Sequence, residues 1–267
     1  MELKREYSVA RRDFYFKHQC TEQPICGALS RHSHNLCELL YFVKGEASYV
    51  IEDKKYKLRP GDLVIIRPSN YHFIEIESVV PYERYDILFD ESELDVREQA
   101  LLHALPDVTC LAEGSIACEI FDRFDVYLRH LDEEAFIHVA GLLLRELFYG
   151  LSMQSEQAQP VVAVVHPMLS RAIEYVNGHL FELRDIKEIA SALFITESYL
   201  FKLFRTELGQ SPKKYVNDKR LLAAQQMLRE GRRPTEAYAA CGFRDYVSFY
   251  RGYRRLFGRA PSEETSK

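Results

Sequence analysis

The sequence predicts an α+β fold in which a β-barrel with an added helical element precedes a separate all-α domain. Two observations lead to this prediction. Short apolar runs separated by turn residues fill the first third of the chain, whereas apolar residues at helical spacing fill the remainder. The chain of 267 residues is long enough for two domains, each with its own core.

The predicted barrel extends from about Phe14 to Phe89. Its clearest strands are short apolar or alternating runs, and residues with turn chemistry separate them. Pro fixes one backbone dihedral and Gly permits a positive φ, so Pro-Gly and similar pairs mark the turns. The strands are expected at 39–43, 47–52, 56–58 and 63–66, with turns at 53–55, 59–62 and 68–70.

The helical element is expected from about Leu94 to Met153. An apolar stripe recurs there at spacings of three and four, through Phe136, Val139, Ala140, Leu143, Leu144, Leu147 and Phe148. Such a stripe suits packing against the barrel and a dimer seam equally well, and periodicity does not separate the two. The polar residues that follow lack periodicity and meet Pro160. We therefore expect a first domain at 1–155, a linker at 156–165 and a second domain at 166–267.

Charge is distributed unevenly between these domains. Residues 166–267 hold 18 Lys and Arg against 12 Asp and Glu, a net charge of +6, whereas residues 1–165 hold 17 against 28, a net charge of −11. This asymmetry is typical of a nucleic-acid-binding segment joined to an acidic domain, although a chance excess of solvated basic residues gives the same count.

The six cysteines form no Cys-x-x-Cys pair and show no zinc-finger spacing. The N-terminus leads into no apolar segment, and no run approaches the roughly 20 apolar residues of a membrane span. We therefore expect free thiols, a cytoplasmic location and no membrane association.

The second domain carries one pattern twice, about 47 residues apart: a short helix, a tight turn, then a helix with basic and aromatic residues that ends at Gly-x-x-Pro. The two longer helices are expected to bury Leu200, Leu203 and Phe204 in the first copy and Phe249, Tyr253 and Leu256 in the second. Their other faces should project toward a DNA major groove, which admits an α-helix. The predicted DNA-facing residues are Ser198, Phe201, Lys202 and Arg205, then Tyr246, Val247, Tyr250, Arg251 and Arg254.

This arrangement resembles the double helix-turn-helix domain of AraC/XylS-type bacterial transcription regulators. The matching positions lie between Ile186 and Pro261 and include Tyr199-Leu200, Phe204, Gly209, Tyr215, Arg220, Gly242-Phe243, Phe249, Gly258 and Pro261. One departure stands out: Tyr238 occupies a position where the family has a small residue. A bulky side chain there should change how the two helices of the second copy approach each other, so the second copy is expected either to read fewer bases or to dock at an altered angle.

The first domain resembles a cupin barrel, in which His-x-His, Glu and a later His can hold one metal ion. The matching residues are His32, His34, Glu38 and His72. Alternate residues of a strand face one side, so the first two histidines can converge inside a barrel. Such a donor set suits a divalent transition metal (Fe, Mn, Ni or Zn). Two other interpretations remain open: hydrogen bonding to a small organic ligand, with Tyr41 and Tyr49 lining the pocket, or a purely structural role at the barrel mouth.

Three functions are compatible with these features. The resemblance implies a ligand-responsive transcription regulator that binds double-stranded DNA and a small-molecule effector, acts as a homodimer and has RNA polymerase as a further candidate partner. A metal-dependent cupin enzyme with an accessory helical domain is the alternative, but it requires neither the repeat nor the basic charge, and the sequence offers no catalytic acid–base pair beyond the candidate ligands. A protein-binding scaffold explains neither the basic faces nor the motif spacing.

Overall fold

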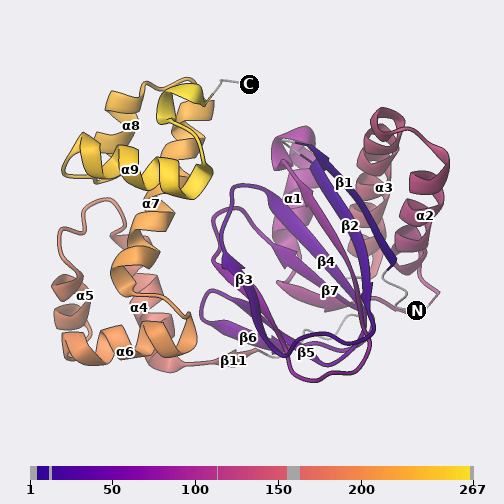
Figure 1. Ribbon diagram of the computed structural model, residues 1–267, viewed down its shortest axis with the longest axis horizontal. Coiled ribbons are helices and arrows are strands. Elements are labelled where there is room, and N and C mark those ends of the chain that lie inside the picture. Colours follow the sequence, from indigo (N-terminus) through magenta and orange to yellow (C-terminus); the bar gives the residue numbers. More distant parts are fainter. Residues whose placement is uncertain (1–4, 12–13, 113, 155–162, 265–267) are drawn as a thin grey trace. The chain divides into compact units, whose positions relative to one another are not determined.

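The computed structural model describes residues 5–11, 14–112, 114–154 and 163–264 (Figure 1). The chain divides into two compact units. The first comprises residues 1–32, 36–51 and 55–164, and the second comprises residues 165–267 together with the short segments 33–35 and 52–54. The first unit holds the β-sheets and the second is helical.

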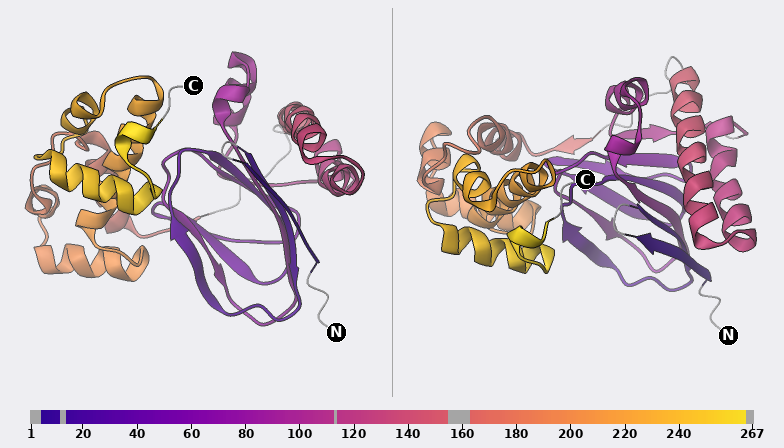
Figure 2. Two further views of the ribbon diagram at one scale, coloured as in Figure 1. Left: turned by 45° about the horizontal axis from the view of Figure 1, so that its top comes forward. Right: turned by 90° about the horizontal axis from the view of Figure 1, so that it is seen from above.

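Two sheets face each other in the first unit and enclose its interior (Figure 2). The six-stranded sheet has the order β1 (Arg5–Arg11), β2 (Phe14–Thr21), β9 (Tyr82–Phe89), β4 (Cys37–Lys44), β7 (Asp62–Ile66) and β10 (Val108–Cys110). The five-stranded sheet has the order β11 (Val164–Val165), β6 (Lys54–Lys57), β5 (Ala47–Ile51), β8 (His72–Ile76) and β3 (Gly27–His32). The predicted cupin-like barrel is confirmed in this two-sheet form.

Strand β4 is buried on both faces, because the sheet that contains it is covered on both sides. Leu40 and Phe42 point into the space between the sheets, while Leu39 and Tyr41 point the opposite way, into a second core formed with the helices. Tyr41 stacks on Phe121 with the ring centroids 4.2 Å apart. The prediction that Tyr41 lines the barrel pocket is therefore wrong.

Three helices, α1 (Val96–Ala104), α2 (Ile116–His130) and α3 (Glu133–Gln154), contribute to the core on the outer face of the six-stranded sheet. Helices α2 and α3 lie side by side there (Figure 2). Helix α3 is long and apolar enough to cross a membrane by length and composition alone. Its stripe is nevertheless core: Leu143 is 2% exposed and Leu147 is 0% exposed within one chain. A dimer seam through those two residues is thereby excluded.

The hairpin after β5 turns one residue earlier than the sequence predicts. Glu52 has a positive φ of 55° and forms the turn with Asp53, so Lys54 and Lys55 already belong to β6. The sequence also gave no signal for β1 or for the three-residue β10. The expected linker falls largely on residues 155–162, which lie outside the described residues.

The second unit consists of α4 (Pro167–Gly178), α5 (Ile186–Ala192), α6 (Glu197–Glu207), α7 (Pro212–Arg229), α8 (Pro234–Ala240), α9 (Tyr246–Phe257) and the short 3-10 helix η2 (Pro261–Glu263). Local capping defines where the helix-turn-helix elements begin. Asp185 and Glu188 form a capping box at α5, Thr196 caps α6, and Asp245 caps α9. Helix α7 runs without interruption from the first helix-turn-helix, α5–α6, to the second, α8–α9.

Candidate DNA-binding surface and barrel site

The two helix-turn-helix elements are joined by contacts to main-chain atoms of the segment before α5. Arg220 of α7 donates from Nε to the Leu180 carbonyl at 2.8 Å and from Nη2 to the Leu183 carbonyl at 2.5 Å. Arg244, in the turn of the second element, donates to the Arg184 carbonyl at 2.7 Å. Because hydrogen bonds from charged donors are stronger than those between neutral groups, these contacts hold the two elements at one mutual spacing.

Helix α6 buries the residues that the sequence assigns to the core. Leu200 and Phe204 are 0% exposed and Leu203 is 5% exposed. Of the predicted DNA-facing residues, Phe201 is half-buried, while three are exposed: Ser198, Lys202 and Arg205. Tyr199 is also exposed, although sequence reasoning left it out of the surface.

Helix α9 differs from the prediction at its first residue. Tyr246 packs edge-on against Tyr238 of α8, with the ring centroids 5.5 Å apart, and also contacts Phe249 of the core. Tyr238, the departure from the family pattern, thus holds Tyr246 against α8, which corrects the prediction that Tyr246 projects freely. Among the other predicted residues, Tyr250 is half-buried, and the exposed ones are Val247, Arg251 and Arg254.

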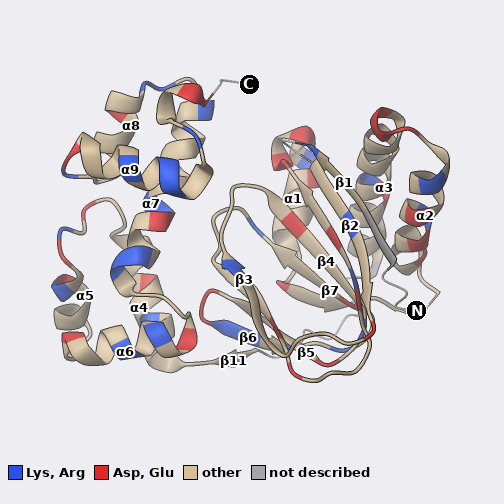
Figure 3. Ribbon diagram, in the orientation of Figure 1, with Lys and Arg blue, Asp and Glu red and all other residues tan. Residues whose placement is uncertain are grey.

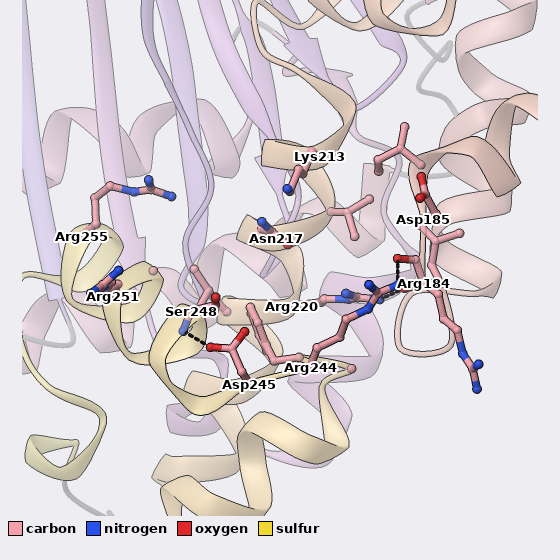
Figure 4. Close-up of a pocket in the computed structure, with 17 residues that line it drawn as sticks. Arg184, Asp185, Lys213, Asn217, Arg220, Arg244, Asp245, Ser248, Arg251 and Arg255 are labelled. Atoms are coloured by element: carbon pink, nitrogen blue, oxygen red, sulfur yellow. Dashed lines mark hydrogen bonds between the residues drawn. The ribbon is translucent and has the colours of Figure 1, made fainter. Parts of the chain in front are cut away.

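A cleft of about 670 Å³ lies between the two elements (Figure 4). The segment before α5 forms one wall, α7 forms the floor, and the turn before α9 together with α9 itself forms the other wall. Its polar and charged lining residues are Arg184, Asp185, Lys213, Asn217, Arg220, Arg244, Asp245, Ser248, Arg251 and Arg255. Lys and Arg recur on α6, α7 and α9 in this unit (Figure 3).

Sequence reasoning missed Lys213, Ser248 and Arg255 as members of this surface. Gly252 packs close to Leu221 of α7, and Ser248 and Arg255 lie one turn to either side of Gly252 on the same face of α9. The heptad-like spacing of 248, 252 and 255 was visible in the sequence. Which face of α9 turns toward α7 was not.

In the barrel, the structure brings the four predicted ligand residues together. One candidate ligand atom from each of His32, His34, Glu38 and His72 lies within 4.8 Å of the others. His32 and His72 are paired neighbours on β3 and β8, with ring centroids 4.4 Å apart. Glu38 and His72 are buried, whereas His32 is exposed, so the cluster reaches from the interior to the surface.

His72 has a defined tautomer. Its Nδ1 lies 2.8 Å from the Asn70 carbonyl oxygen, which only accepts, so Nδ1 carries the proton. Nε2 faces the Glu38 Oε2 at 3.2 Å. In the neutral imidazole this places a lone pair against a carboxylate, and either a proton on Nε2 or a cation removes the repulsion. A far N–H bonded to a backbone carbonyl is the arrangement that metal-binding histidines adopt.

Further polar groups accompany this cluster between the sheets. The Tyr49 hydroxyl donates to the Glu38 Oε1 at 3.2 Å, and burial, followed by the charge of Glu38, raises the pKa of Tyr49. Arg84 donates from Nε to the Asp86 Oδ2 at 2.7 Å. Burial has the largest effect on Asp86 and raises its pKa. The positive charge of Arg84 lowers this pKa and the negative charge of Glu38 raises it, so that the pKa of Asp86 remains raised. Tyr49 therefore lies where the sequence predicted, and Arg84 and Asp86 are additions to the polar interior.

Comparison with known proteins agrees with this division. A model of the AraC-like ligand-binding domain matches residues 19–104, and a model of a helix-turn-helix domain matches residues 189–266. The probable transcriptional regulator LumQ of Photobacterium leiognathi is 35% identical over 89 residues, which are 33% of this chain and 36% of LumQ. The regulator YobQ of Bacillus subtilis is 28% identical over 244 residues, which are 91% of each protein.

Among solved structures, fatty-acid-bound ToxT of Vibrio cholerae aligns over 96% of this chain and 95% of its own, with a TM-score of 0.41 and 14% identity. The fold and the two matching models together define a protein with a ligand-binding barrel and a helix-turn-helix DNA-binding domain. The chain belongs to the AraC family of transcription regulators.

Proposed function

We propose that the chain binds a specific operator through α6 and α9 and that a ligand held in the barrel regulates this binding. One observation carries the DNA-binding part. Four cations on these helices form no side-chain hydrogen bond or ion pair with any other residue that the structure describes: Lys202, Arg205, Arg251 and Arg254. The hydrogen bonds from Arg220 to the Leu180 and Leu183 carbonyls hold the two helix-turn-helix elements at a fixed spacing. Unpaired cations on a rigid pair of helices suit two successive major grooves.

Selection of bound sequences from random duplex DNA tests this proposal. We expect two half-sites about one helical turn (~10 bp) apart, because the two units should read one face of the duplex. Recovery of a single half-site would contradict the use of both helices. Recovery of no preferred sequence would contradict operator binding altogether.

For the barrel, we propose a ligand that engages Glu38, His72 and Tyr49. The donor set of three imidazoles and one carboxylate fits a divalent transition metal, which His32, His34, Glu38 and His72 would hold. Such an ion would supply a Lewis-acidic point of attachment for an oxygen-bearing effector. The residues fit a polar organic ligand as well, with Arg84 and Asp86 as additional partners.

Metal analysis of protein purified without an affinity tag separates these ligands. We expect close to one equivalent of metal in the wild type and a large loss in His34→Ala if the ion is the ligand. Less than a tenth of an equivalent, in protein supplied with metal, would leave the organic ligand as the proposal.

Regulation rather than catalysis is proposed for the whole chain, with the sensor at 1–155 and the DNA-binding domain at 166–267. The alternative is a metal-dependent enzyme. Its activity should remain when the basic residues of α6 and α9 are replaced by neutral ones. We further propose a homodimer in the cytoplasm, with RNA polymerase as a partner. An exposed apolar face on α3, opposite the buried stripe, is available for the dimer: Leu142, Tyr149 and Met153.

A further inference from the structure

The cleft between the two helix-turn-helix elements is strongly electropositive. Six of its lining residues are Lys or Arg and two are Asp. Both carboxylates serve as helix caps: Asp185 accepts from the Lys187 amide at 3.0 Å, and Asp245 accepts from the Ser248 amide at 2.7 Å. Neither one forms a salt bridge with a lining cation among the described residues. Six positive and two negative side chains leave the lining with an excess of positive charge.

The cations of the cleft divide into two kinds. Arg220 and Arg244 donate to backbone carbonyls, which are neutral, so their charge persists while their position is fixed. Lys213 and Arg255 are exposed and form no side-chain hydrogen bond or ion pair with any residue in the described part of the chain. They come from different elements, Lys213 from the start of α7 and Arg255 from α9 (Figure 4).

Of the α9 residues proposed to read bases, Arg251 also lines the cleft, whereas the others lie farther around the helix from Arg255. Arg255 lies on the face that Gly252 presses against α7, whereas Val247, Tyr250 and Arg254 lie on another face of the helix. When two helices occupy successive major grooves, the strand between those grooves must pass the protein between the helices. The cleft lies beside α9, between the second element and the start of the first, and its lining comes from the segment before α5, Ile186, α7 and the second element. A strand that leaves the groove occupied by α9 toward the first element would meet this cleft.

We propose that this cleft binds the phosphodiester backbone of the DNA between the two half-sites, with Lys213 and Arg255 as the donors to phosphate oxygens. The inference rests on the proposed operator binding and adds to it a sequence-independent contact. Contacts to phosphate fix register and orientation on the duplex but carry no base information. Each such contact also releases counterions and therefore steepens the salt dependence of binding.

The test measures dissociation constants of the full chain for a selected operator duplex and for a scrambled duplex, across a series of KCl concentrations. Lys213→Ala and Arg255→Ala should each lower the slope of log K against log salt by about one. At 0.15 M salt each should weaken binding roughly fivefold, by the same factor on both duplexes, and the selected sequence should not change.

Arg171→Ala is the matched control, because Arg171 is an exposed arginine of α4 outside the cleft. It should leave the affinity and the slope as in the wild type. An equal effect of Arg171→Ala would show that overall charge, rather than the cleft, is responsible, and would overturn the proposal. Unchanged melting temperatures in all three variants are expected, because the substituted side chains are exposed.

Four further outcomes are decisive. Wild-type affinity and slope in both cleft variants would overturn the proposal, and so would altered preference at one base position, because the residue would then read sequence. Binding of pyrophosphate to the DNA-free protein that Arg255→Ala abolishes, with DNA affinity unchanged, would assign the cleft to a free anion instead. A wild-type chain that selects no sequence would defeat operator binding itself, which is a separate result.

Discussion

Gly242 lies so close to the main chain of Phe181 that a Cβ at position 242 would stand 2.2 Å from the Phe181 carbonyl oxygen. Gly242 also has a positive φ of 75°, which side chains rarely adopt. It belongs to the turn of the second helix-turn-helix, whereas Phe181 precedes the first. The absence of a side chain at this position is what lets the two elements meet.

Gly242→Ala is therefore expected to destabilise the second unit by at least about 2 kcal/mol, through left-handed strain and a clash with backbone that cannot move aside. Urea unfolding followed by far-UV circular dichroism measures the loss. Gly178→Ala, at the end of α4 where a Cβ meets open space, is the control and should be neutral. Equal stability of the two variants would show that the backbone at Gly242 and Phe181 moves apart to accommodate a side chain.

Phe194 presents the opposite case, a bulky residue where glycine would be favoured. Its φ is 56° and its side chain is 93% exposed in the turn between α5 and α6. Phe194→Gly removes left-handed strain worth about 1–2 kcal/mol but adds backbone entropy to the unfolded chain, so stability should hold or rise by up to about 1 kcal/mol. A clear loss of stability in the same urea assay would reveal packing by Phe194.

His18 links β2 to α2 and β9. Its Nδ1 lies 2.7 Å from Asp125 and its Nε2 lies 2.9 Å from Glu83, beside Tyr85 and Lys44. Burial opposes protonation, but the hydrogen bonds and charges of the two carboxylates outweigh it and raise the pKa of His18 above 6.5. Its contribution to stability is thus complete below about pH 6.5 and is lost as pH rises through the folded-state pKa.

His18→Gln should flatten the dependence of the free energy of unfolding on pH above about 6.5. Denaturant titrations of the wild type and the variant across this range provide the measurement. A wild-type stability that rises with pH in this window would contradict the assignment.

On DNA, Lys202→Ala and Arg251→Ala should each cost about 1–3 kcal/mol and relax preference at particular positions of the selected operator. Lys202 should matter more, because Tyr238 alters the packing at the start of α9 and so disturbs the second reading surface. Binding assays against single-base variants of the operator rank the two residues. Equal or reversed losses would refute that order.

Neighbouring leucines of α3 should separate folding from association. Leu143→Ala should cost about 2–5 kcal/mol of stability, as expected for a buried leucine, with no change of oligomeric state. Leu142→Glu, on a side chain that is 54% exposed, should keep stability but dissociate the proposed dimer. Light scattering at micromolar concentration reports the state, and a dimer that survives Leu142→Glu would place the seam elsewhere.

Local chemistry made much of the fold predictable. The capping box at Asp185 and Glu188 and the buried face of α6 depend on residues close in sequence. The approach of His32 to His72 depends on the pairing of β3 with β8, and the resemblance to a cupin barrel implied it. The orientation of Tyr41 was not predictable, because a strand apolar on both faces does not reveal which face meets the interior. The same reason hid Arg255: the side of α9 that meets α7 depends on packing between distant segments.

The contacts that join the two DNA-reading elements end on carbonyl oxygens of Leu180, Leu183 and Arg184 rather than on their side chains. Substitutions along that segment would leave those acceptors in place. If α6 and α9 read the operator as proposed, changing their exposed residues should alter operator preference while the distance between half-sites stays constant. An engineered variant of this chain should keep the spacing between half-sites and change only its base preference within each half-site.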